Sequence, residues 1–545
     1  MLGTPSGFEA EALAEIADSL RPTGTSPTTD LRFDSSGVRI VRKGRLVAAC
    51  HLGVRRVETT KLTRGERTAR RLREQQIWTM AILYSLVLAA ALYLRSWGLG
   101  AESIWYDEAI SIAQSSGTFE NLITLASQDN YPPLHNLLIH PLLRIFGNSE
   151  ALVRLPSLLF SMIAIIATAG LASTLGRPRA GLFAAVVLAF SSFQIYYAQE
   201  ARMYALLAGC TALCSWSMAS YLTRPGLGRG LLVTLSAGAT LYSHFFGMLN
   251  VFALGIASLI IAIFMRARLP RGATLCFVWV GLGGVLFTPW VAFVITRVSS
   301  VTKAGFWIPY PEPSFLWAQL NTMLDGPVGI AISITGLALA IFFGVQKRPT
   351  RDPEAESNDA ILVVVSLSLL VIPFLISLAA SLLATPVIFH RYLIGSLPAL
   401  AVLVGLGFDF LIRLFKTPFR LPLTVLFTGA LAGALLFAAY PRLYPHKENW
   451  RAVASYISQR WSSDDCIAVG DITLLAPLRF YLGQIDCGLG LPAQAEQASR
   501  TTGRLFLPAV GWTQGATQEG IERLEKSGFS LTDRFVTEQV ELAVL

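Results

Sequence analysis

Two adjacent carboxylates stand in an apolar part of the sequence. The stretch SIWYDEAISI places Asp107 and Glu108 after two aromatic residues and before Ala109 and Ile110. Apolar surroundings disfavour the charged form of a carboxylate and raise its pKa towards values that suit proton transfer. The pair could therefore supply a general base, bind a cation, or serve only as solvated charges in a loop or at the start of a helix.

A second stretch, YYAQEARMY at 196–204, gathers an acid, an amide, a base and several tyrosines in one short segment. Such a set can form many hydrogen bonds to a polar ligand. An aromatic belt at the membrane surface with a local ion pair is the simpler interpretation. The candidate donor- or acceptor-binding residues of this stretch are Tyr197, Gln199, Glu200, Arg202 and Tyr204.

The stretch NYPPLH at 130–135 adds Tyr131 and His135 as candidates. Its prolines fix the backbone that leads into a helix, with His135 on the first turn, although a turn and a capped helix would give the same pattern. The remaining candidates are Arg154, His244, Lys303, His390 and Arg391. Arg154 could simply snorkel from the start of its span. Lys303, His390 and Arg391 are each more often membrane anchors, but together they could hold a lipid-linked phosphate.

The composition predicts that these residues are positioned by membrane-spanning helices. Of 545 residues, 53% are hydrophobic and 14% are charged, whereas an ordinary soluble domain is about 25% charged. Crossing about 30 Å of hydrocarbon takes about 20 apolar residues. The predicted fold is a polytopic α-helical membrane protein with about eleven spans, at 77–95, 152–175, 180–197, 203–222, 229–243, 246–265, 273–294, 326–345, 360–384, 391–413 and 422–440.

The basic residues beside these spans predict their direction. They cluster at 64–73, 177–179, 224–229, 266–271, 347–351 and 413–420. All of these clusters lie on the cytoplasmic side if the amino terminus is cytoplasmic and the carboxyl terminus external. The apolar segment 132–147 is too short to span, and a span there would reverse every later loop, so we expect an interfacial or re-entrant helix. The first external loop is then 97–151, and the candidate polar residues gather at the outer face.

Two further parts flank the predicted membrane domain at 77–440. Residues 1–76 form a cytoplasmic extension in which 37–54 suggests a hairpin. Residues 441–545 alternate helical and strand patterns, which predicts a small external α/β domain. Cys466 and Cys487 are the plausible disulfide partners, provided that this domain is external. The net charge of +9 is dispersed, so no nucleic-acid partner is expected.

The motifs YDEA, YPPLHNLLIHPLLRIFGNSEALVRLPS and SSFQIYYAQEARMYAL resemble glycosyltransferase family 39 in their order and spacing, over roughly residues 100–210. This family includes protein O-mannosyltransferases and lipid A aminoarabinose transferases, within the glycosyltransferase C superfamily. The resemblance implies that Asp107 is the base that deprotonates the acceptor hydroxyl, with Glu108 in support. Some relatives carry Lys where this chain has Tyr131, so His135, Arg202, Lys303 or Arg391 would contact the donor phosphate instead.

The expected function is transfer of a sugar from a polyprenyl phosphate to an external glycan, lipid or protein acceptor by an enzyme of the plasma (inner) membrane. No nucleotide cofactor is expected, because no nucleotide-binding domain is visible, and a divalent metal requirement stays open. An ion-coupled transporter is one alternative, but it should show mid-membrane ionisable groups and paired repeats. A non-catalytic protein of envelope assembly is the other.

Overall fold

The computed structural model describes residues 29–34, 37–42, 45–50, 64–129, 131–265, 272–304, 307–345, 353–442, 447–491, 494, 497, 503–526 and 528–545. The chain divides into two compact units, Met1–Glu74 and Gln75–Leu545. In the first unit, β1 (Thr29–Asp34), β2 (Gly37–Arg42) and β3 (Arg45–Cys50) form an antiparallel sheet in the order β1-β2-β3. The expected hairpin is present as β2 and β3, and β1 adds a strand that was not predicted.

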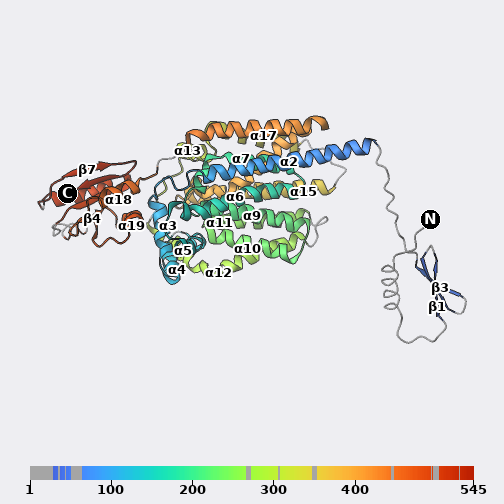
Figure 1. Cartoon of the computed structure of the whole chain (residues 1–545), viewed down its shortest axis with the longest axis horizontal. Coiled ribbons are helices and arrows are strands. Elements are labelled where there is room, and N and C mark those ends of the chain that lie inside the picture. Colours follow the sequence, from blue (N-terminus) through green and yellow to red (C-terminus); the bar gives the residue numbers. More distant parts are fainter. Residues whose placement is uncertain are drawn as a thin grey trace, which may run out of the picture. The chain divides into compact units, whose positions relative to one another are not determined.

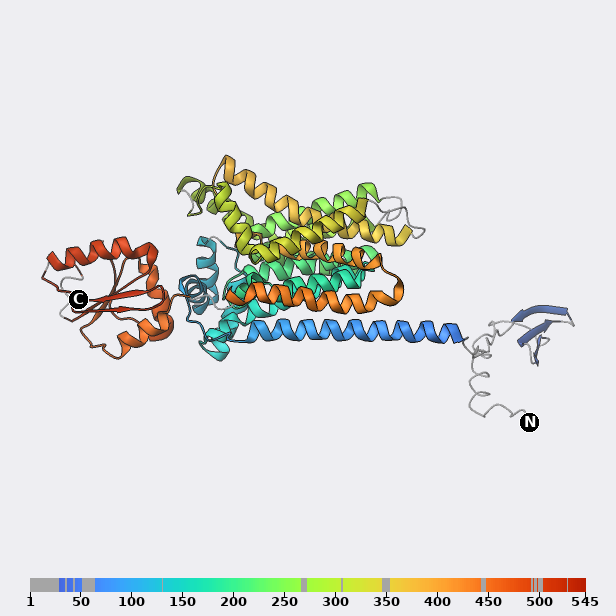
Figure 2. The same ribbon diagram turned by 90° about the horizontal axis from the view of Figure 1, so that it is seen from above.

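Long apolar helices form the bundle of the second unit (Figures 1 and 2). They are α2 (Arg64–Ser96), α6 (Glu150–Thr174), α7 (Pro178–Phe190), α8 (Ser192–Ala198), α9 (Tyr204–Thr223), α10 (Leu227–Ser243), α11 (Phe246–Phe264), α12 (Gly272–Ala304), α14 (Gly326–Val345), α15 (Pro353–Leu383), α16 (Leu397–Arg413) and α17 (Thr417–Ala439). The described residues contain nine helices long and apolar enough to cross a membrane, or ten if the bent pair α7 and α8 counts as one span.

Most predicted spans correspond to these helices, with two differences. The segment 180–197 is broken, because α7 and α8 meet at an angle of 65°. The segment 229–243 is α10, which has 17 residues and a length of about 26 Å, short of the hydrocarbon thickness of about 30 Å. An eleventh span at this position stays a prediction.

Helices α9 and α16 form the centre of the bundle. The apolar windows of α9 and of the span His390–Arg413 are 83% and 89% buried, compared with 17% for α2. Small residues allow the central helices to approach closely, as is usual between membrane helices. A Cβ atom on Gly209 of α9 would lie 2.5 Å from the carbonyl oxygen of Phe160 on α6. The outward face of α2 stays free for lipid.

The segment between the first two spans contains three short helices, where one large loop with a single interfacial helix was expected. These are α3 (Tyr106–Ser116), α4 (Phe119–Gln128) and α5 (Leu134–Phe146), at one end of the bundle (Figure 1). With 13 residues, α5 is about 20 Å long, too short to span, which agrees with the interpretation of 132–147. Asp107 and Glu108 lie on the first turn of α3, not in a loop.

The C-terminal part is a small α/β fold, as predicted. Its mixed sheet has the order β5-β4-β6-β8-β7. Its elements are α18 (Trp450–Ser458), β4 (Cys466–Val469), α19 (Leu475–Leu482), β5 (Gly488–Gly490), β6 (Leu505–Ala509), α21 (Gln514–Lys526), β7 (Asp533–Val536) and β8 (Glu541–Val544). The terminal hairpin is β7 and β8, whereas β5 and α21 were not predicted.

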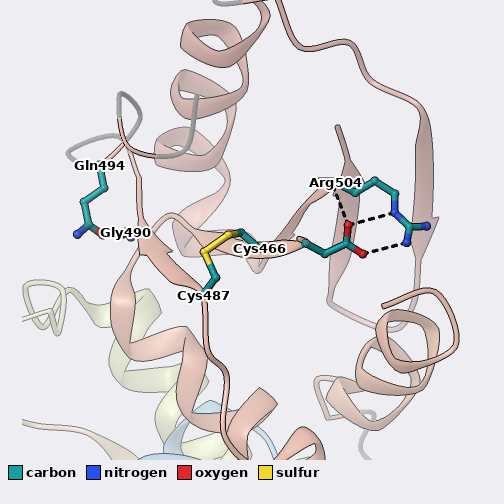
Figure 3. The surroundings of a disulfide bond; sticks show 6 residues. Cys466, Cys487, Gly490, Gln494 and Arg504 are labelled. Carbon is teal, nitrogen blue, oxygen red and sulfur yellow. Dashed lines mark hydrogen bonds and ion pairs between the residues drawn. A yellow bond between two sulfur atoms is a disulfide. The ribbon is translucent and has the colours of Figure 1, made fainter. Parts of the chain in front are cut away.

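A disulfide joins Cys466 to Cys487, the pair that the sequence indicated (Figure 3). It links the start of β4 to the residue before β5, with 21 residues of separation. At the same end of β4 but on its other side, the guanidinium of Arg504 and its backbone N–H both donate to the carboxylate of Asp465. The disulfide and the ion pair together hold the two flanks of β4.

Candidate functional site

Glu108 is locked in a buried ion pair. Its side chain is 0% exposed, and Arg154 donates from Nε to Oε1 and from Nη2 to Oε2, both at 2.7 Å. The backbone N–H of Ala201 donates to Oε1 at 2.7 Å, and the Nζ of Lys447 lies 3.6 Å from the same atom. Burial alone would raise the pKa of Glu108, but the cations of Arg154 and Lys447 and these hydrogen bonds hold it at about 2. Glu108 is therefore an ionised anchor.

Arg154 does not snorkel to the surface, because its side chain is 1% exposed. Besides Glu108, it donates to the carbonyl oxygens of Leu99, Glu102 and Ser103 at 2.9 to 3.0 Å. A guanidinium has five N–H donors, and these five bonds use all of them. Arg154 thus fixes the segment before α3 to α6 and has no donor left for a ligand.

Asp107 faces a different set of groups, and its side chain is 21% exposed. Its Oδ2 atom lies 3.3 Å from Nη1 of Arg391 and 3.9 Å from Nη2 of Arg202. Arg202 also donates from Nη1 to the carbonyl oxygen of Asp107 at 3.1 Å and to Ser111 Oγ at 3.0 Å. Two guanidinium groups from distant parts of the chain therefore converge on one accessible carboxylate.

Aromatic rings surround the two arginines. The guanidinium carbon of Arg202 lies 5.0 Å from the ring centre of Tyr131, and that of Arg391 lies 5.3 Å from Tyr204 and 5.2 Å from Trp307. The ring of His244 lies 5.0 Å from those of Tyr131 and Tyr392, whose hydroxyl oxygens are 3.3 Å apart. Tyr197 packs on Tyr204 with ring centres 5.0 Å apart. Such walls exclude water and strengthen cation–π and charge interactions inside them.

The two arginines keep unused donors in this enclosure. The Nε atoms of Arg202 and Arg391 are buried and have no hydrogen-bond acceptor among the residues that the structure describes. Buried charged donors without an acceptor are costly, and a bound oxyanion would satisfy them. The site is thus arranged to receive a phosphate or a similar anion beside Asp107.

The buried histidines and Glu200 complete the surroundings. Burial lowers the pKa of His135 and His244 to about 3, so both are neutral. Neither ring nitrogen of His135 has a partner in the described part of the chain, and the same holds for both carboxylate oxygens of Glu200. Burial raises the pKa of Glu200 to about 7, against the opposing charge of Lys447. Glu200 does not form the local ion pair with Arg202 that the simpler interpretation of this stretch required, because Arg202 contacts Asp107 instead.

Three predicted residues lie away from this enclosure or outside the described side chains. Gln199 donates to the carbonyl oxygens of Leu94, Arg95 and Trp97 at 2.8 to 3.2 Å and so ties α8 to the end of α2. His390 contacts Gln319 of α13 (Pro313–Met323) through its ring and its backbone N–H. The side chain of Lys303 lies outside the described part of α12.

His390 lines an apolar cavity of about 800 Å³. Its walls come from α13, α14, α15, α16 and the 3-10 helix η1 (His390–Ser396), and they include Leu316, Trp317, Leu337, Phe374, Phe389 and Leu400. The residue that follows His390 is Arg391, which faces Asp107. The apolar cavity therefore begins one residue along the chain from Arg391.

Three residues of this region were not among the predicted site residues: Lys447, Glu448 and Tyr392. Lys447 donates to the carbonyl oxygen of Gln199 at 3.1 Å, and Glu448 accepts from the backbone N–H of Tyr106 at 3.0 Å. Both belong to the stretch HKENWR before a helix, which resembles bacterial members of glycosyltransferase family 39 only weakly and does not single out either residue. Among the described residues, no group of three or more His, Cys, Asp or Glu side chains is placed to hold a metal ion.

A family model matches part of the chain. Residues 130–293 match the family model PMT_2, described as dolichyl-phosphate-mannose-protein mannosyltransferase. This range holds Tyr131, His135, Arg202 and His244 but not Asp107. No curated protein matches the sequence.

Solved structures match a larger part of the chain. ArnT from Cupriavidus metallidurans in the apo state has a TM-score of 0.57 at 13% identity, and the match covers 85% of this chain and 97% of that one. ArnT bound to undecaprenyl phosphate has a TM-score of 0.53 at 14% identity with the same coverage. The oligosaccharyltransferase of Archaeoglobus fulgidus, in complex with Zn and sulfate, has a TM-score of 0.51 at 10% identity and covers 78% of this chain and 67% of that one. The resemblance to glycosyltransferase family 39 is therefore confirmed, and the chain has the fold of the glycosyltransferase C superfamily.

Proposed function

We propose that this protein transfers a sugar from a polyprenyl phosphate to an external acceptor hydroxyl, with Asp107 as the general base. The observation that carries the proposal is the pairing of one partly exposed carboxylate with two guanidinium groups whose Nε atoms are buried and have no acceptor among the described residues. A transfer of this kind needs a base for the incoming hydroxyl and cations for the departing phosphate. Both requirements are met within one small enclosure.

The reaction is a single displacement. The acceptor oxygen forms a bond to the anomeric carbon while its proton passes to the carboxylate of Asp107. The bond between the anomeric carbon and the phosphate oxygen breaks, and its electron pair leaves with the lipid phosphate. Arg202 and Arg391 stabilise the charge that develops on the phosphate, because guanidinium groups bind phosphate oxygens in a fixed fork. Displacement from the opposite face inverts the anomeric carbon.

The apolar cavity beside His390 is the proposed binding site for the lipid chain of the donor. The apolar cavity of about 800 Å³ beside His390 can take part of an isoprenoid chain, and a lipid bound there would have its phosphate near Arg391. The solved structure of ArnT with undecaprenyl phosphate shows that a protein of this fold binds such a lipid. We infer that His390 and Gln319 mark the boundary between the lipid and its phosphate, with Tyr131, Tyr204 and His244 around the sugar.

The proposed topology places the site at the outer face of the plasma (inner) membrane. The amino terminus and residues 1–76 are cytoplasmic, residues 77–440 span the membrane, and residues 441–545 are external. The disulfide between Cys466 and Cys487 supports an external position, since disulfides persist in oxidising compartments. The acceptor would be a glycan, a lipid or a protein that reaches this face.

The test is the Asp107→Asn variant, compared with the parental protein and with Asp464→Asn in the exposed turn before β4. Purified protein in liposomes receives undecaprenyl phosphate carrying radiolabelled mannose, glucose, galactose or arabinose, with envelope extract as the source of acceptor. Loss of a general base typically costs a factor of 10² to 10⁴, so we expect kcat to fall at least about a hundredfold in Asp107→Asn only.

Binding of undecaprenyl phosphate serves as the second measurement. Asn has no negative charge to repel the phosphate, so Asp107→Asn should bind the lipid phosphate at least as tightly as the parental protein. Unchanged transfer by Asp107→Asn would refute the role of Asp107. Absence of transfer from every donor by the parental protein would favour the envelope-assembly alternative, and donor-independent solute uptake would favour a transporter.

A further inference from the structure

The five residues KENWR, Lys447–Arg451, connect the C-terminal fold to the turn that carries Asp107. Lys447 is 7% exposed. Its ammonium group donates to the carbonyl oxygen of Gln199 at 3.1 Å, lies 3.6 Å from Oε1 of Glu108, and lies 5.4 Å from the ring centre of Tyr196. Lys447 thus adds a second buried cation to the ion pair of Glu108 and Arg154.

Glu448 supplies the cap of α3 from outside that helix. The first N–H groups of a helix lack intrahelical acceptors, and Trp105 at the N-cap position provides no side-chain hydrogen bond. Instead, Oε2 of Glu448 accepts from the N–H of Tyr106 at 3.0 Å and from Nε1 of Trp450 at 2.6 Å. A carboxylate at this end of a helix is also favoured by the helix dipole.

The segment before α3 is held by the same part of the chain. Arg451 donates from Nη1 to the carbonyl oxygen of Ala101 at 3.0 Å, and its backbone N–H donates to Ser103 Oγ at 3.0 Å. The hydroxyl of Tyr481 in α19 accepts from the N–H of Ile104 at 2.8 Å. The backbone on both sides of Trp105 is therefore fixed by residues from 447 onward.

We infer that Lys447 and Glu448 are positioning residues for the proposed transfer, which hold the first turn of α3 so that Asp107 stays aligned with Arg202 and Arg391. The inference rests on the proposed function of Asp107. Neither residue contacts Asp107, Arg202 or Arg391: Lys447 acts through Glu108, and Glu448 acts through the backbone of Tyr106. A displacement of about 1 Å in a catalytic group can cost about a hundredfold in rate. The C-terminal fold therefore contributes by holding Asp107 in position, and it supplies no group that takes part in the reaction.

The experiment compares Lys447→Met with Lys526→Met, an equivalent change at an exposed lysine of α21. The number of sites that bind undecaprenyl phosphate and their Kd are measured first, and kcat is then expressed per binding site. We expect Lys447→Met to keep the Kd within about threefold and to lower kcat per site about tenfold to a hundredfold, with Lys526→Met unchanged. Equal loss of binding sites and of transfer, with normal kcat per site, would assign Lys447 to folding alone and overturn the inference.

A double-variant comparison tests the route through Glu108. Since Lys447 acts through Glu108, the protein that combines Lys447→Met and Glu108→Gln should lose no more activity than the single variant with the larger loss. Fully multiplicative losses would contradict that route. The cap is tested in parallel: Glu448→Gln keeps an oxygen acceptor and should retain near-parental kcat, whereas Glu448→Ala should reduce it. Equal activity of these two variants would overturn the role of Glu448.

Two different results would separate a failure of the proposed function from a failure of the positioning roles of Lys447 and Glu448. Transfer by the parental protein that is abolished in Asp107→Asn but unchanged in Lys447→Met and Glu448→Ala would overturn the positioning roles alone. Absence of transfer by the parental protein would overturn both.

Discussion

Replacing Arg154 with Met should destabilise the protein in a way that depends strongly on pH. Arg154 and Glu108 are 1% and 0% exposed, so the variant leaves a carboxylate buried without its principal partner. Removal of one member of a buried ion pair costs about 3 to 5 kcal/mol. The pKa of Glu108 gives a second value for the contribution of this ion pair to the free energy of unfolding. A fall of the pKa from the usual 4.5 to about 2 corresponds to about 3 kcal/mol, since each tenfold change in proton affinity is worth about 1.4 kcal/mol.

The direction of the pH dependence follows from that pKa. The folded-state pKa of Glu108 lies below its unfolded-state value, so the stabilisation is present above about pH 4.5 and is lost as the pH falls towards 2. In Arg154→Met, burial outweighs the remaining charge of Lys447 and raises the pKa of Glu108 above its usual value. The variant should therefore be least stable relative to the parental protein at pH 8, and the difference should narrow at pH 5 as Glu108 becomes neutral.

Thermal unfolding in detergent, followed by intrinsic fluorescence at pH 8 and pH 5, measures this difference. The matched control is Arg144→Met, because Arg144 is an exposed arginine in the last turn of α5. We expect a Tm several degrees lower for Arg154→Met at pH 8 and a Tm close to parental for the control. Equal Tm values for the two variants at both pH values would refute the reasoning. A lowering of the Tm of Arg154→Met by the same amount at both pH values would assign the lost stability to the contacts of Arg154 with carbonyl oxygens.

Three further predictions concern the rest of the molecule. Cys466→Ser should lower the stability of the C-terminal fold by about 2 to 4 kcal/mol, visible as faster proteolysis of residues after 447 than in the parental protein under non-reducing conditions. Gly209→Leu should lower the yield of folded protein, because a Cβ atom there would lie 2.5 Å from a carbonyl oxygen, whereas Gly255→Leu, with no atom within 4 Å, should be tolerated; equal yields by size-exclusion chromatography would contradict this. Arg391→Gln should weaken binding of undecaprenyl phosphate about tenfold to a hundredfold, since a charge-assisted hydrogen bond is worth about 1.5 to 3 kcal/mol, and an unchanged Kd would exclude Arg391 from the phosphate site.

Local patterns were sufficient to predict most helices of the bundle and the strands of the C-terminal fold other than β5. Long apolar runs and short alternating runs are visible in the sequence because each element needs only its own residues to show its period. The break in the span at 180–197 was not visible in this way. Its bend of 65° lies at Ser191, whose side chain caps α8 by accepting from the N–H of Gln194, and a serine in an apolar run does not by itself indicate a new helix.

The candidate site was predictable in part, because its residues stand beside one another in short polar stretches. Asp107 and Arg202 were selected for that reason and do meet. Glu448 and Lys447 were not selected as site residues, because their roles depend on contacts between segments more than 300 residues apart in the sequence. No periodicity encodes such a contact. The sequence pattern of HKENWR identifies a helix start, and only the fold shows that its charges face α3.

The adjacent acids differ in role because of the geometry of the helix that carries them. Successive residues of an α-helix point about 100° apart, so Asp107 and Glu108 on the first turn of α3 cannot face the same partners. Glu108 points to Arg154 and Lys447 and is fully enclosed, while Asp107 points to Arg391 and Arg202 and stays partly exposed. The buried ion pair fixes the rotation of α3 about its axis, and that rotation aims the exposed carboxylate at the two arginines. One acid therefore sets the direction of the other, which explains why a pair of carboxylates stands at this point in an apolar chain.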